Sequence, residues 1–121
     1  MDTLELLLKA EIPNLPEKNF KVKRLSELCG DPVIFQLRAL PYNRAAEIVK
    51  EQKDDMNVHI LLAGVVSPNL KAKELQEKYK TSTPAELVKA MLLPGEIEDI
   101  SRAVEQLSGY RTTTIEEIKK K

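Results

Sequence analysis

The chain has 121 residues, with 19 Lys and Arg balanced by 19 Asp and Glu, so its formal net charge is zero. This length favours one domain over residues 1–121 that buries a real core. The charge balance argues against a nucleic-acid partner, because phosphate neutralisation usually requires a basic excess. A single cysteine rules out a disulfide within the chain, and no apolar run approaches the ~20 residues that span a bilayer. We therefore expect a cytoplasmic protein with no membrane contact.

The N-terminal residues 1–16 are predicted to form an apolar arm and a linker. Asp2 can cap a short helix whose Leu4, Leu7 and Leu8 share one side, at i, i+3, i+4 spacing. Pro13 and Pro16 then prevent the helix from continuing and favour extended chain. Two interpretations follow: the arm folds back over the core, which we expect, or it binds a partner.

Two segments with alternating polarity then predict an antiparallel β-hairpin. Phe20, Val22 and Arg24 alternate with lysines, and the second strand is expected within residues 33–40, where Phe35 and Leu37 share a face. A seven-residue connection, Ser26 to Pro32, should contain one helical turn ended by Gly30. Two strands alone are marginally stable in water, so helices must cover their apolar face.

From Pro41 onward the period changes from two to about 3.6, which predicts about five short helices. Val58 to Val66 is apolar nearly all round and should be the central buried helix. Thr83-Pro84-Ala85-Glu86 is a strong helix start, and Gly109 is a suitable helix end. Residues 111–121 are expected to be a last short helix or a frayed, flexible tail. The predicted fold class is α+β and mostly helical, with an N-terminal antiparallel β-hairpin packed against about five short helices.

The sequence lacks the residue patterns that are typical of metal sites, phosphate-binding loops and acid–base catalysis. His59 has no second His and no neighbouring Cys to form a metal site, and no glycine-rich phosphate loop occurs. Adjacent acidic residues such as Asp54 and Asp55 diverge by about 100° on a helix, so they make poor acid–base partners. We therefore expect no enzyme, and no catalytic, cofactor-binding or metal-binding residues.

Four sequence phrases occur in a characteristic order along the chain. They are Leu25-Ser-Glu-Leu, Ser67-Pro-Asn-Leu, Thr83-Pro-Ala-Glu-Leu and Leu92-Leu-Pro-Gly-Glu-Ile. With the two extended segments before them, these phrases resemble the XkdN-like tail assembly chaperones of long-tailed phages and prophages, over roughly Leu4 to Ile118. The resemblance implies a non-enzymatic chaperone that binds the tape-measure protein, and the tail-tube protein is a further implied partner. Such a chaperone helps tail-tube assembly and is absent from the mature virion.

These four segments are better explained as determinants of the fold than as contact residues, so the resemblance assigns no binding residues. The candidates for client contact are the apolar side chains near the two ends of the chain, namely Leu4, Leu7, Leu8, Ile115 and Ile118. Two alternatives stay open: a helix-turn-helix regulator with helices at Lys71–Tyr79 and Pro84–Leu92, and a structural tail completion protein. The sequence leaves the binding face and the oligomeric state open.

Overall fold

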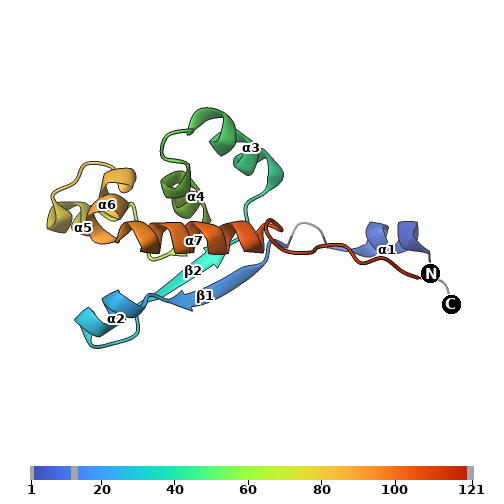
Figure 1. Ribbon diagram of the computed structural model, residues 1–121, viewed down its shortest axis with the longest axis horizontal. Coiled ribbons are helices and arrows are strands. Elements are labelled where there is room, and N and C mark those ends of the chain that lie inside the picture. Colours follow the sequence, from blue (N-terminus) through green and yellow to red (C-terminus); the bar gives the residue numbers. More distant parts are fainter. Residues whose placement is uncertain (1, 12–13, 120–121) are drawn as a thin grey trace.

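A computed structural model describes residues 2–11 and 14–119. Within these residues the chain forms seven helices and a three-stranded antiparallel sheet, so the predicted α+β, mostly helical class is confirmed (Figure 1). The elements in chain order are α1 (Thr3–Lys9), β1 (Glu17–Lys21), α2 (Lys23–Cys29), β2 (Ile34–Arg38), α3 (Tyr42–Glu51), α4 (Met56–Gly64), β3 (Val65–Ser67), α5 (Lys73–Tyr79), α6 (Pro84–Met91) and α7 (Pro94–Leu107).

The predicted hairpin exists, but its first strand lies earlier in the chain than expected. β1 pairs with β2 in a register that sets Phe20 opposite Phe35, and the chain enters α2 at Lys23. The expected strand through Arg24 was therefore wrong, because Leu25 packs against the core from a helix instead. The connection between the strands spans residues 22–33, and its helix ends at Gly30 with a φ of 75°. The Ser26 hydroxyl closes it by donating to Val22 O at 2.7 Å and accepting from Val33 N at 2.8 Å.

A third strand was not expected. β3 pairs with β2 on the side away from β1, so β2 is the central strand. The predicted helix from Val58 to Val66 was wrong at its end, since α4 stops at Gly64. Val65 and Val66 are β-branched and favour extended chain, and pairing with β2 gives their backbone groups partners.

The core lies where α4 and α7 cross above the sheet. α4 contributes Leu61, fully buried, and α7 contributes Val104, also fully buried, so the prediction that α4 is the central buried helix is confirmed. The two helices approach so closely that a Cβ on Gly64 would lie 2.5 Å from both Val104 methyl carbons. Other core side chains come from the sheet and from α3 and α6, namely Phe35, Leu37, Ile48, Leu87 and Val88.

Both ends of the chain lie outside this body. α1 stands off the body, and none of its residues is buried, so the expected fold-back over the core was wrong (Figure 1). The chain before β1 continues the strand direction, with Pro16 O accepting a hydrogen bond from Ala39 N at 2.9 Å. This extension carries the helix past the end of the sheet. Residues 113–119 form neither helix nor strand, which excludes the expected last helix from them.

Candidate functional site

The N-terminal arm, residues 2–11, presents an uncovered apolar stripe. Asp2 caps α1 by accepting a hydrogen bond from Glu5 N at 2.9 Å, which sets the helix start as predicted. Leu4, Leu7 and Leu8 then lie on one side and are 65%, 59% and 76% exposed. Leu6 lies on the other side of the helix and is also exposed. A contiguous group of exposed leucines is typical of a protein-binding surface.

The two isoleucines predicted for client contact lie in the C-terminal segment, residues 113–119. Ile115 and Ile118 are 85% and 83% exposed. This segment and the N-terminal arm extend from the same end of the body (Figure 1). The structure therefore gathers all five predicted residues on one side of the molecule, and none of them joins the buried core cluster.

A second apolar surface lies between β1 and α7, and we call it the β1–α7 groove. The inner face of the sheet packs against α7 at β2, where Phe35 and Leu37 are buried. β1 is one of the two edge strands of the sheet, and its inward-facing Phe20 is 38% exposed. The groove exists because no helix in the described part of the chain covers this edge of the sheet.

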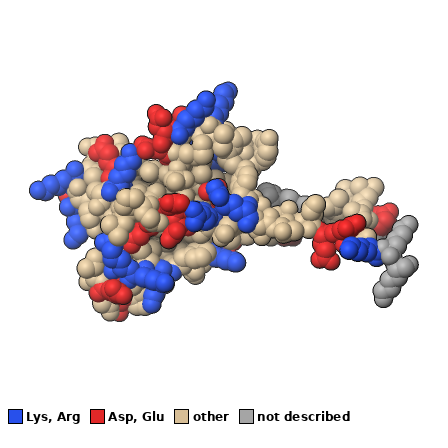
Figure 2. Space-filling view, in the orientation of Figure 1, with Lys and Arg blue, Asp and Glu red and all other residues tan. Residues whose placement is uncertain are grey.

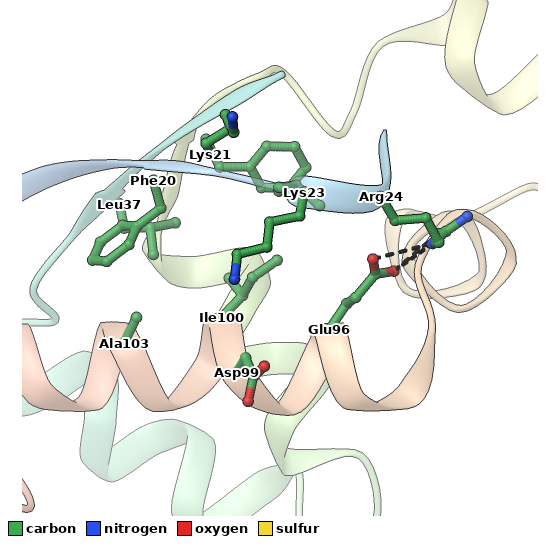
Figure 3. Close-up of a pocket in the computed structure, with 11 residues that line it drawn as sticks. Phe20, Lys21, Lys23, Arg24, Leu37, Glu96, Asp99, Ile100 and Ala103 are labelled. Atoms are coloured by element: carbon green, nitrogen blue, oxygen red, sulfur yellow. Dashed lines mark hydrogen bonds and ion pairs between the residues drawn. The ribbon is translucent and has the colours of Figure 1, made fainter. Parts of the chain in front are cut away.

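The groove consists of two adjoining hollows of about 360 and 340 Å³ that share Phe20 and Ala103. Figure 3 shows the first hollow, with Phe20 and Leu37 on the strand side and Ile100 and Ala103 on α7. The second hollow continues along α7 toward its C-terminal end. Its lining adds Lys18, Gln106, Leu107, Arg111 and Thr112.

The polar rim of the groove is mainly basic. Five cationic side chains line the two hollows, against two acidic ones, which gives a net charge of +3; the cations are Lys18, Lys21, Lys23, Arg24 and Arg111, and the acids are Glu96 and Asp99. In Figure 2, Lys and Arg side chains gather over the region where β1 meets α2. Elsewhere on the visible face of the body the two charge signs are interspersed.

One ion pair closes the α2 end of the groove. Arg24 Nη2 lies 2.9 Å from Glu96 Oε1 and 3.0 Å from Met91 O, and Arg24 Nε donates to Glu96 Oε2 at 3.1 Å. These hydrogen bonds lower the pKa of Glu96 and raise that of Arg24. Glu96 Oε1 also accepts from Leu93 N at 2.7 Å, so the same carboxylate caps α7. The pair joins α2 to the start of α7 and fixes the width of the groove at this end.

Across residues 2–11 and 14–119, no three His, Cys, Asp or Glu side chains gather closely enough to hold a metal ion. His59 lies half-buried in α4. Among the helices of the described chain, none has the length and apolar character needed to cross a membrane.

The helices proposed for DNA recognition are poorly equipped for it. α5 and α6 are consecutive and in contact, with α6 capped by Thr83 Oγ1 accepting from Glu86 N at 3.1 Å. A reading helix presents donors to base edges from its first turns. Here that region holds Pro84 and Glu86, and the ammonium group of Lys89 is bound to Asp55 at 2.7 Å.

The β1–α7 groove was not predicted from the sequence. Phe20 belongs to the face of the hairpin that helices are expected to cover, and no sequence pattern sets Ala103 and Leu107 beside it. The only local signal was a single phenylalanine among lysines at 18, 21 and 23. That pattern indicates a half-exposed aromatic, but only the packing of α7 over β2 shows which residues stand beside it.

Comparison with known proteins identifies the family. The model of the phage XkdN-like tail assembly chaperone family matches residues 4–120, so the chain belongs to this family. The uncharacterised protein YqbN of Bacillus subtilis strain 168 is 34% identical, in a match that covers 60% of this chain and 60% of that protein. A crystal structure of a protein named YqbN superposes with a TM-score of 0.71 and 26% identity, over 91% of this chain and 98% of that one.

Proposed function

We propose that this protein is a non-enzymatic chaperone that binds the tape-measure protein during phage tail assembly and assists the tail-tube protein. Family membership supports the general role. The observation that carries the specific proposal is the uncovered apolar arm, with Leu4, Leu7 and Leu8 each more than half exposed. A long helical client with an apolar stripe needs that stripe masked before assembly, and an exposed amphipathic helix can do this without a catalytic group.

We assign client contact to Leu4, Leu7 and Leu8 of the arm and to Ile115 and Ile118 of the C-terminal segment. All five are exposed, so substituting them leaves the core intact. The protein acts in the cytoplasm of the bacterial host and leaves before the virion is complete.

Co-expression tests the proposal. The protein and the tape-measure protein of the same tail gene cluster are produced together, and the complex is recovered from the soluble fraction by affinity pull-down. We expect a soluble complex with the intact chain and its loss in a variant carrying Leu4→Ser, Leu7→Ser and Leu8→Ser. Tyr42→Ser is the matched control, because Tyr42 is 84% exposed on α3. A client that stays insoluble with the intact chain would refute direct chaperoning.

A structural tail component is the competing role, and it makes a different prediction. A completion protein stays in the particle, whereas a chaperone is released. Mass spectrometry of purified virions distinguishes them, and stoichiometric recovery of this chain would favour the structural role.

A further inference from the structure

We propose that the N-terminal arm of one copy seats its leucines in the β1–α7 groove of a second copy, forming a dimer with exchanged arms. Two surfaces of the same chain are left without a partner, and each has the character that the other requires. The inference concerns the protein alone, so it does not depend on the identity of its client.

The apolar surfaces match in kind and in accessibility. The floor of the groove offers Phe20, Ala103 and Leu107, all partly exposed. The arm offers Leu4, Leu7 and Leu8 along one side of α1. Burying these side chains against one another removes from water a group of leucines that are each more than half exposed.

The charges are complementary. The side chains of residues 2–11 include three acids, Asp2, Glu5 and Glu11, and one base, Lys9, a net charge of −2. The lining of the groove carries +3, and Glu105, which lies 3.4 Å from Arg111 at its edge, reduces this to +2. Opposite potentials favour encounter and orient the arm, and two arms placed side by side would instead repel.

The dimensions allow the fit. The hollows follow α7 from Glu96 to Leu107, which is roughly 17 Å at 1.5 Å per residue. α1 has seven residues and is about 10 Å long, so it fits within this length. The half near Phe20 and Leu107 is the more accessible one, because Arg24 and Glu96 close the other end.

The position of the arm favours binding to the groove of a second copy over binding to the groove of its own chain. The arm leaves the body at the end where β1 begins and α7 finishes, which is the open end of the groove (Figure 1). To enter its own groove, the arm would have to turn back before Pro16, whose carbonyl is held by Ala39 N in line with β1. Two copies meeting end to end need no reversal, and each receives the other's arm in a symmetric, closed contact.

The test measures the mass of the protein in solution by sedimentation velocity and by light scattering across a wide range of concentrations. We expect the intact chain to form dimers in a concentration-dependent equilibrium. The groove variant Ala103→Glu and the arm variant with Leu4→Ser, Leu7→Ser and Leu8→Ser should each dissociate. Each lost leucine contact should weaken the dimer by roughly tenfold or more. Tyr42→Ser should dimerise like the intact chain.

Mixing the two variants identifies the contact. The arm variant keeps an intact groove and the groove variant keeps an intact arm, so together they should form a heterodimer that neither forms alone. A monomer at every concentration would overturn the proposal, and so would a groove variant that still dimerises, since that indicates arm-against-arm contact. Growth into open chains of increasing mass would overturn the symmetric exchange.

A second groove variant keeps the test decisive if Ala103→Glu disturbs folding, which circular dichroism would reveal. Lys18→Glu combined with Arg111→Glu reverses charge at the rim, where both side chains are exposed. It should weaken the dimer more at low salt than at high salt, because the effect is electrostatic. The arm leucines are also the proposed client contact, so the groove variants separate the two ideas: they should lose the dimer and still recover the client in the pull-down.

Discussion

Two short apolar helices of this protein differ in how far they are buried. α4, Met56–Gly64, places four residues in the core, whereas α1, Thr3–Lys9, buries none. Their lengths are nine and seven residues, so length does not separate them. The difference lies in where the polar residues stand. α4 is apolar nearly all round, whereas α1 places Glu5 and Lys9 away from the stripe of Leu4, Leu7 and Leu8.

The comparison shows that an apolar stripe in this chain has one of two uses. On α4 it stabilises the fold, because the helix packs against α3, α6, α7 and β3. On α1 it stays available to another molecule. Substitutions in the two helices should therefore separate stability from binding.

The largest expected effect is on stability, at the centre of α4. Leu61→Ala removes a fully buried side chain and leaves a cavity between α4 and its neighbours. We expect the free energy of unfolding to fall by about 2–5 kcal/mol, measured by chemical denaturation. A loss below that measured for an arm leucine would contradict the assignment of α4 to the core.

A smaller loss is expected from adding volume at the same crossing. Gly64→Ala places a methyl group 2.5 Å from the Val104 methyl carbons, so we expect a loss of about 1–3 kcal/mol. Combining it with Val104→Ala makes room for the added methyl, so the double variant should lose less than the sum of the two single losses. Strict additivity in denaturation curves would contradict the close approach of α4 and α7.

Helix boundaries were the part of this fold most open to prediction from sequence. Thr83 and Glu86 define the start of α6 by a local hydrogen bond, and Pro84 fits the first helical position. Gly109 has a φ of 95°, so its assignment to a helix end is confirmed. These features are determined by residues three or four apart, and a single sequence displays them.

The missed features depend on contacts between distant segments. β3 forms because Val65 pairs with Leu37, which is 28 residues away in the sequence, and no local sequence pattern predicts that pairing. The β1–α7 groove depends on which strand α7 covers. The exposure of the predicted client residues agrees with their assignment as surface residues, but whether they bind the client stays a prediction.

Stability at acid pH tests the ion pair between Arg24 and Glu96, which joins α2 to the start of α7. Hydrogen bonds from Arg24 hold the pKa of Glu96 below its ordinary 4.5, so the folded state binds this proton less readily than the unfolded state. The stabilisation is therefore present above that value and is lost as the pH falls through the lower, folded-state pKa. Glu96→Gln should flatten the acid limb of the unfolding free energy against pH.

Arg24→Gln is the matched variant for this test. It removes the main cause of the shift, so most of the flattening should already be present, and adding Glu96→Gln should change the acid limb little further. A residual contribution is expected from the hydrogen bond that Leu93 N donates to Glu96. Acid limbs that run parallel in the intact chain and in Glu96→Gln would contradict the pair's contribution.

The smallest effect on stability should come from the arm, and this is what makes its apolar stripe a binding surface. Leu7 is 59% exposed in a helix that contributes nothing to the core cluster, so Leu7→Ser should change the unfolding free energy of dilute, monomeric protein by less than about 0.5 kcal/mol. The same substitution should reduce recovery of the soluble client complex. If it instead destabilised the monomer as Leu61→Ala does, the arm would be packed on the body in solution, and the distinction between α1 and α4 would fail.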